Sequence, residues 1–182
     1  MSDVPAGTHA FGPSDGQLRL KVYREGVASK MGHDLVIEVK DWSAKVDAHP
    51  DDLSQSSVEA TAEVPSFTVV EGTGGTKPLT RTDKADIKKN IDEKILKDTS
   101  TITFRSNGTA TVSGSRVSVP GELTINGTSR PIDVDIELDG GKARARFKVV
   151  QSQFGIKPFK AFMGALKVRD DVEVELEVPI PG

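Results

Sequence analysis

The chain contains no cysteine, and this absence excludes disulfide bonds, thiol catalysis and thiolate metal sites. It leaves the redox compartment of the protein open. Aromatic residues are also scarce, at 5% of the chain, with a single tryptophan and a single tyrosine. An interior with so few aromatic side chains leaves more room than an aromatic-filled one.

Long hydrophobic runs and a basic excess are absent too. No apolar run approaches the length of a transmembrane helix, and the N-terminus lacks the basic and apolar regions of a secretory signal. The 182 residues carry a formal net charge of -3, which gives no bulk attraction to nucleic acid or to an anionic membrane. We expect a cytoplasmic protein without nucleic-acid binding, folded as one domain over residues 1–182.

What the sequence does contain is a sustained alternation of apolar and polar residues. Period two over such lengths is typical of half-buried antiparallel strands. Asn126-Gly127 and Asp139-Gly140-Gly141 separate the clearest runs, and these residues accept the positive φ of tight hairpins. The alternation predicts strands at 18–22, 33–46 with a bend near Asp41, 57–64, 101–106, 109–125, 132–138, 142–149 and 169–178.

The period changes once, between residues 83 and 96. Ile87, Ile91 and Ile95 recur every four residues, and Thr82 or Asp83 can cap the start, so we expect a helix over 83–96. We expect residues 1–16 to be a polar lead-in, 71–80 a mobile glycine-rich loop, and 152–166 irregular. The loop is also a candidate gate, since long loops at barrel mouths often carry function.

These elements predict an all-β protein, an antiparallel eight-stranded barrel with one α-helix between the third and fourth strands. A barrel of that size is filled by side chains or holds one small ligand. A sandwich is the alternative. Many interior positions carry small residues such as Ala60, Ala62, Ala143 and Ala145, which favours a hollow interior.

Charges on the outward positions predict the neighbours of the strand at 142–149. Its outward residues are basic, including Arg144 and Arg146, whereas those of 132–138 and 169–178 are acidic. Opposite charges on adjacent strands stabilise a sheet slightly. We therefore expect acid, base, acid as the strand order and Arg144 on the outer surface, rather than a nucleic-acid patch.

No pattern indicates catalysis or a metal site. The stretch 72–77 lacks the features of a phosphate-binding loop, because its lysine precedes Pro78 and no helix starts there. His9, His33 and His49 show no ligand spacing, and no serine sits in a nucleophile-elbow motif. His33, at a strand start, is either a paired structural histidine or a contact for a polar head group.

Several segments resemble the YceI family of polyisoprenoid-binding, lipocalin-like proteins. GELTINGTSRP at 121–131 is similar to the family's G-x-L-T-I-x-G-x-x-[KR]-P segment, TITFRS at 101–106 to its I-x-F-x-S strand, and SQFGI at 152–156 to its S-x-F-G-I. Gly32 with Leu35 resembles its early glycine and hydrophobe. The order fits from about Phe11 to Val178, with Gln151 at the position of the family's usual arginine.

The resemblance implies an elongated apolar cavity that holds a polyprenyl phosphate, an isoprenoid quinone or a fatty amide. We expect a carrier of a long apolar lipid, not an enzyme, with no cofactor beyond a bound isoprenoid lipid or quinone. The alternatives are a filled barrel acting as an interaction or structural module and, least favoured, a lipid isomerase or hydrolase. Transient membrane contact and a homodimer stay open.

The candidate site residues follow from the apolar phase of the strands and from an aromatic segment, Phe154–Met163, within the region expected to be irregular. The aromatic segment is either plain core or the lining of an entrance. We expect a polar head near His33, Lys77 and Arg81, because basic groups suit a phosphate or quinone oxygen. The predicted cavity residues are Leu20, Ile37, Phe67, Phe104, Leu123, Ile125, Phe147, Phe154, Phe159 and Phe162.

Overall fold

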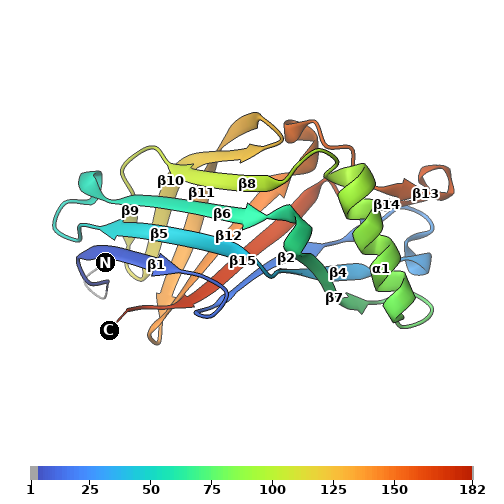
Figure 1. Cartoon of the computed structure of the whole chain (residues 1–182), viewed down its shortest axis with the longest axis horizontal. Helices are drawn as coiled ribbons and strands as arrows, with labels where there is room; N and C mark the ends of the chain where they lie inside the picture. Colours follow the sequence, from blue (N-terminus) through green and yellow to red (C-terminus); the bar gives the residue numbers. More distant parts are fainter. Residues whose placement is uncertain (1–3, 182) are drawn as a thin grey trace.

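A computed structural model describes residues 4–181 as an all-β fold with one α-helix. The main sheet is antiparallel and curls around an elongated interior, and helix α1 crosses it near one end (Figure 1). Within the described residues this sheet has twelve strands. They are β1 (Gly7–Phe11), β2 (Gln17–Val22), β4 (Asp34–Val39), β5 (Trp42–Ala48), β6 (Ser57–Glu63), β7 (Phe67–Thr73), β8 (Thr101–Ser106), β9 (Thr111–Ser113), β10 (Arg116–Ile125), β11 (Thr128–Asp139), β12 (Lys142–Val150) and β15 (Asp171–Pro179).

A second sheet of three short strands lies beyond the main one. Its order is β13 (Lys160–Ala161), β14 (Leu166–Val168) and β3 (Arg24–Glu25). Short 3₁₀ turns flank these strands, η1 at Ser29–Met31 and η6 at Phe162–Gly164. The remaining 3₁₀ turns are η2 (Leu53–Gln55), η3 (Val64–Ser66) and η5 (Gln151–Phe154).

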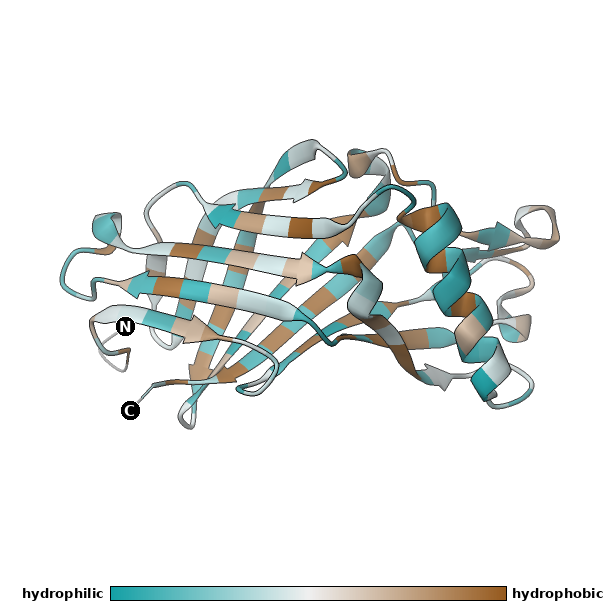
Figure 2. Ribbon diagram, viewed as in Figure 1, coloured by the Kyte–Doolittle hydropathy of each residue, from teal (hydrophilic) through white to brown (hydrophobic). Residues whose placement is uncertain are grey.

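Alternation along the strands separates the two faces of the main sheet. Cross-strand partners such as Leu20 and Ile37, or Phe104 and Leu123, fall on the same inner face. The hydropathy colouring shows apolar and polar residues in turn along most strands (Figure 2). The inner positions form two apolar clusters, one around Trp42 and Phe67 and the other around Phe104 and Leu123.

Two of the predicted strands, 33–46 and 109–125, are interrupted, and the second divides into β9 and β10 at Gly114 and Ser115. The run expected at 33–46 divides into β4 and β5 at Lys40 and Asp41, close to the predicted bend. The strand expected at 57–64 forms as β6, and β7 follows it after the turn at Val64–Ser66, where Pro65 cannot donate to the ladder. The number of strand segments among the described residues therefore exceeds the eight predicted.

Three segments expected to lack regular structure contain strands. The lead-in at 1–16 contains β1, which pairs with β5 from Gly7 to Phe11. The loop expected at 71–80 is shorter, because β7 continues to Thr73. The irregular region at 152–166 contains β13 and the start of β14, which are too short for periodicity to reveal.

The predicted helix forms, with a different cap and a different end. Helix α1 spans Arg81–Asn90 and continues as a π-helical turn, η4, over Ile91–Ile95. Its N-cap is Thr80, not Thr82 or Asp83: Asp83 N donates to Thr80 Oγ1, and Thr80 N donates to the Asp83 carboxylate. The hydrogen bond that the Thr80 backbone amide donates to the Asp83 carboxylate lowers the pKa of Asp83. No helix in the described part of the chain is long and apolar enough to cross a membrane.

The outer face of β12 carries the predicted row of ion pairs. β12 lies between β11 and β15, and Arg144 faces Glu137 on one side and Glu177 on the other. Arg144 Nε lies 2.9 Å from Glu177 Oε2, and Arg146 Nη2 lies 3.2 Å from Glu175 Oε1. The acid, base, acid order and the outward direction of Arg144 are confirmed. Hydrogen bonds from Lys142 and Arg144 lower the pKa of Glu177.

We predict that Arg144→Glu destabilises the protein only modestly at neutral pH, because exposed ion pairs contribute little. Glu177 has a lowered pKa in the folded state, so the stability it provides is present above its unfolded pKa and is lost as the pH falls through the folded value. The difference between wild type and variant should therefore shrink well below the ordinary glutamate pKa of about 4.3. Urea denaturation at neutral and acidic pH measures it.

Arg144→Gln is the control for this experiment, since it removes the pair without adding a third carboxylate. It should lose less stability than Arg144→Glu at neutral pH. A loss that is large and independent of pH would contradict an exposed electrostatic role.

Candidate functional site

The interior of the curled sheet is an elongated cavity of about 540 Å³. Its wall includes inward side chains from every strand of the main sheet except the short β9, among the described residues, and from α1 and η4. The wall is almost wholly apolar, with Leu20, Ile37 and Leu123 as typical members. An apolar space of this kind, within the usual range of roughly 300–1,000 Å³ for ligand pockets, suits an apolar molecule.

Small side chains keep this interior hollow. Ala44 and Ala60 face each other across β5 and β6, and Ala62 is the partner of Trp42 in the same ladder. Ala143 and Ala145 line the cavity from β12. Methyl groups extend too little from a curled sheet to meet side chains of the opposite wall. The low aromatic content of the sequence therefore leaves the interior of the sheet unfilled.

The structure brings most of the predicted cavity residues together. Those in the wall are Leu20, Ile37, Phe67, Phe104, Leu123, Ile125, Phe147 and Phe159. Contact between these side chains and a ligand is still a prediction.

The structure corrects the prediction that Phe154 and Phe162 line the cavity, because neither residue is in the wall. Phe154 is buried in η5 and packs into the cluster around Phe104 and Leu123, behind the cavity surface. Phe162 is 59% exposed at the tip of the β13–β14 turn, where positive φ directs its side chain outward. The aromatic segment thus contributes Phe159 to the cavity but does not line it as a whole.

Sequence reasoning missed several wall residues. Phe11 comes from β1, which lay in the expected lead-in, and Trp42 from the start of β5, where it is 4% exposed. Ile87, Ile91 and Ile95 line the cavity from α1 and η4. Their spacing of four residues predicted the helix. The same three isoleucines form the apolar face that the helix turns toward the sheet.

One end of the cavity is bordered by polar groups that the fold holds in place. Arg24 Nη1 donates to the carbonyls of Gly32 and Thr73 at 3.0 and 2.8 Å, and the Arg24 amide donates to Asp34. His33 Nε2 lies 2.6 Å from the carbonyl oxygen of Lys77. Both Arg24 and His33 are in the wall. His33 is therefore the predicted paired histidine and a cavity residue at once.

The glycine-rich loop closes onto these two side chains. Gly74 and Gly75 have φ of +78° and +70°, and a Cβ at either position would collide with the Arg24 guanidinium or the His33 ring. Glycine meets both requirements, the left-handed backbone and the close approach. The loop predicted to be mobile is thus anchored by contacts at its centre.

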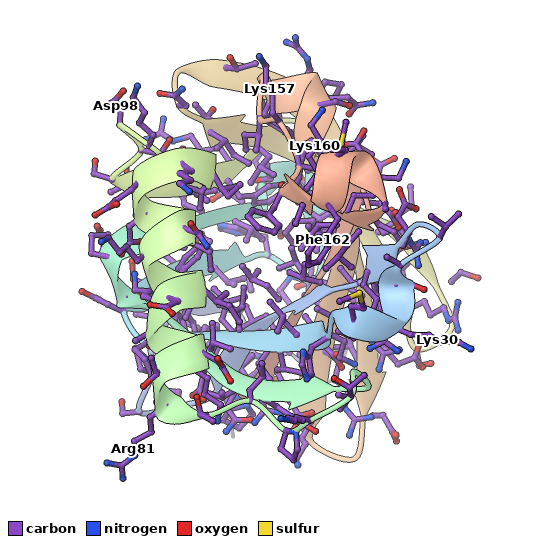
Figure 3. All side chains as sticks on the ribbon, turned by 90° about the vertical axis from the view of Figure 1, so that its right-hand side faces the viewer. Lys30, Arg81, Asp98, Lys157, Lys160 and Phe162 are labelled. Carbon is purple, nitrogen blue, oxygen red and sulfur yellow. The ribbon has the colours of Figure 1, made fainter. Side chains whose placement is uncertain are left out.

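Of the other predicted head-group residues, neither is in the cavity wall. Lys77 is exposed and borders a shallow outer pocket that it shares with His33 and Asp83. Arg81 begins α1, and its side chain projects away from the molecule (Figure 3). The structure therefore places Lys77 beside His33, whereas Arg81 borders neither the cavity nor the outer pocket.

Gln151 is the one polar residue among the buried residues of the described region, and it lies in the cavity wall. Its amide nitrogen donates to the carbonyl oxygen of Arg169 at 3.1 Å. Arg169 in turn lies 5.2 Å from the centre of the Tyr23 ring. The Tyr23 hydroxyl donates to Glu173 at 2.8 Å, and this hydrogen bond raises the pKa of Tyr23.

In residues 4–181 no group of three or more carboxylates and histidines is arranged to hold a metal ion.

Known structures share this architecture. BcnA from Burkholderia cenocepacia superposes with a TM-score of 0.62 at 19% identity, over 88% of this chain and 94% of that chain. The YceI protein of Campylobacter jejuni gives a TM-score of 0.56 at 18% identity, over 78% of this chain and 81% of that chain. Comparison with curated protein sequences gave no match. The sequence profile of the YceI-like domain matches residues 15–180, and the chain therefore belongs to the YceI-like family.

Proposed function

We propose that this protein binds and carries a long apolar lipid of the isoprenoid class, held inside the curled sheet. The observation that carries the proposal is the apolar wall of the 540 Å³ cavity. In this proposal the sheet works as a barrel of eight strand runs, which are β2, β4–β5, β6–β7, β8, β10, β11, β12 and β15. The short strands β1 and β9 add to this barrel by pairing with β5 and β10. Apolar area buried on binding would stabilise the complex by about 25 cal/mol per Å², before the cost of association.

Membership of a family known for polyisoprenoid binding supports the lipid class. The polar side chains of the wall support binding over catalysis. Arg24 and Gln151 both donate to backbone carbonyls, so their hydrogen bonds stabilise the fold. A filled barrel that serves only as an interaction module is the competing function, and the unfilled interior counts against it.

Organic extraction of the purified protein tests the proposal directly. We expect mass spectrometry of the extract to show an isoprenoid lipid or quinone in an amount comparable to that of the protein. For protein purified without lipid, a fluorescent isoprenoid analogue should bind and be displaced by unlabelled isoprenoid. An empty extract together with no binding of the analogue would reject the carrier function and favour the interaction module.

We further propose that a polar head lies at the end of the cavity bordered by His33 and Lys77. Lys77→Gln should then weaken binding of a prenyl phosphate several-fold, and should leave an uncharged prenyl alcohol of equal length unaffected. The loss should diminish as salt is added, because the lysine is exposed. Titration of both lipids against both proteins measures the difference.

Arg81→Gln is the matched control for Lys77→Gln. It removes the same charge from an exposed position that lies outside the pocket shared by Lys77 and His33 and whose side chain projects away from the molecule (Figure 3). Equal effects of the two substitutions, or equal losses for the two lipids, would contradict a head-group role for Lys77 and leave the apolar cavity unaffected.

We predict that Ile125→Asp abolishes lipid binding or unfolds the protein, because an unpaired carboxylate is costly in an apolar interior. Ile125 is 3% exposed and lies in the cavity wall. Val112→Asp introduces the same group at an exposed position and should leave both fold and binding intact. Circular dichroism separates unfolding from lost binding. Normal lipid binding by folded Ile125→Asp would contradict the assignment of this wall.

A further inference from the structure

Exposed apolar side chains gather at one end of the molecule. The described residues include five large apolar side chains that are exposed, and four of them lie on two neighbouring turns. We call these four the apolar tip: Val27, Met31, Phe162 and Met163. The turns are held together because Ala28 N donates to Ala165 O at 2.8 Å and β3 pairs with β14.

The backbone at the tip is unusual for the residues it carries. Phe162 and Met163 have φ of +51° and +56°, a left-handed conformation that bulky side chains disfavour. This geometry leaves Phe162 59% exposed and Met163 fully exposed. Two large apolar side chains are thus held outward, where they contribute nothing to the core of the isolated protein.

Positive charge surrounds the apolar tip. The segments 24–33 and 151–168 contain five lysines and arginines and one acidic residue, Glu25, although the whole chain carries -3. Arg24 donates to backbone carbonyls, and Lys167 lies 3.7 Å from Glu25. Lys30, Lys157 and Lys160 are exposed, and none belongs to an ion pair of the described residues. Figure 3 shows them with Phe162 on the same end of the molecule.

We propose that this end docks on the surface of an anionic lipid bilayer. The apolar tip would enter the boundary between head groups and acyl chains, and the three free lysines would contact lipid phosphates. A bilayer fits both features, since it offers an apolar layer directly beneath a negative surface. A second copy of the chain fits less well, because a two-fold interface would bring lysines of like charge together.

The apolar tip lies beside one end of the cavity, and this position connects docking to lipid exchange. Gly32, His33, Leu166 and Lys167 all lie in the cavity wall and also belong to the segments that carry the tip. A protein docked here would have this end of its cavity next to the membrane. This connection rests on the proposed carrier function, whereas bilayer binding itself can be measured without any ligand in the cavity.

Sedimentation with vesicles tests the docking. Wild type should sediment with vesicles of equimolar phosphatidylcholine and phosphatidylglycerol, much less with pure phosphatidylcholine, and less as salt is added. Lys30→Gln, Lys157→Gln and Lys160→Gln together should weaken the partition coefficient about a hundredfold, at about fivefold per lysine. Phe162→Asn with Met163→Asn should weaken it about tenfold or more. Asparagine accepts left-handed backbone, so this pair should fold normally.

The charge control is Lys45→Gln, Arg116→Gln and Lys142→Gln together. Lys45 is exposed on β5 as the partner of Ala10 in β1, Arg116 begins β10, and Lys142 pairs with Pro179 near the C-terminus. β1, the start of β10 and the C-terminus lie toward the opposite end of Figure 1. These substitutions remove the same total charge and should leave sedimentation nearly unchanged. Equal losses in the two triple variants would overturn the proposal, since only overall charge would then matter.

Isoprenoid binding in solution, measured on the same preparations, separates this inference from the proposed function. A protein that takes up isoprenoid but fails to sediment with anionic vesicles overturns the docking alone. A protein that sediments but takes up no isoprenoid leaves docking in place and overturns the carrier function. A concentration-dependent dimer that is lost in Phe162→Asn with Met163→Asn, without vesicle binding, would overturn the docking in favour of self-association.

Discussion

Alternation of side chains across a single curled sheet is the constraint on which the whole molecule depends. Because successive residues point to opposite faces, a slip of one position would turn the cavity wall outward and the charged rows inward. The pairing of Leu123 with Phe104 inside, and of Arg144 with Glu177 outside, therefore belongs to one register. The same alternation in the sequence therefore produces both the apolar interior and the ion-paired exterior.

The interior of most domains of this size is filled to the density of an organic crystal. Here the alanine side chains of β5, β6 and β12 are too small to fill the interior. An unfilled apolar space lowers stability because its lining lacks contacts on one side. The ladder of the sheet and the glycine contacts around Arg24 and His33 hold the wall in place around that space.

Sequence reasoning identified the elements that are long and regular. Strands such as β11, β12 and β15 carry enough alternating residues to fix both their extent and their neighbours. It missed β1, which has only five residues, begins with Gly7 and is followed by Gly12-Pro13, and it missed the two-residue strands β3 and β13. It placed Phe162 inside because aromatic residues are usually buried, and no local pattern revealed the left-handed turn that exposes it. Trp42 escaped the site prediction since its inward direction depends on the bend at Lys40 and Asp41.

The single tryptophan has a practical consequence. Trp42 is nearly inaccessible to solvent, and its indole forms part of the cavity wall. All tryptophan emission from this chain therefore arises from one site beside the cavity contents. Its wavelength reports the polarity of whatever occupies the interior, and a bound electron acceptor would quench it. The protein thus contains an intrinsic optical sensor of its own occupancy.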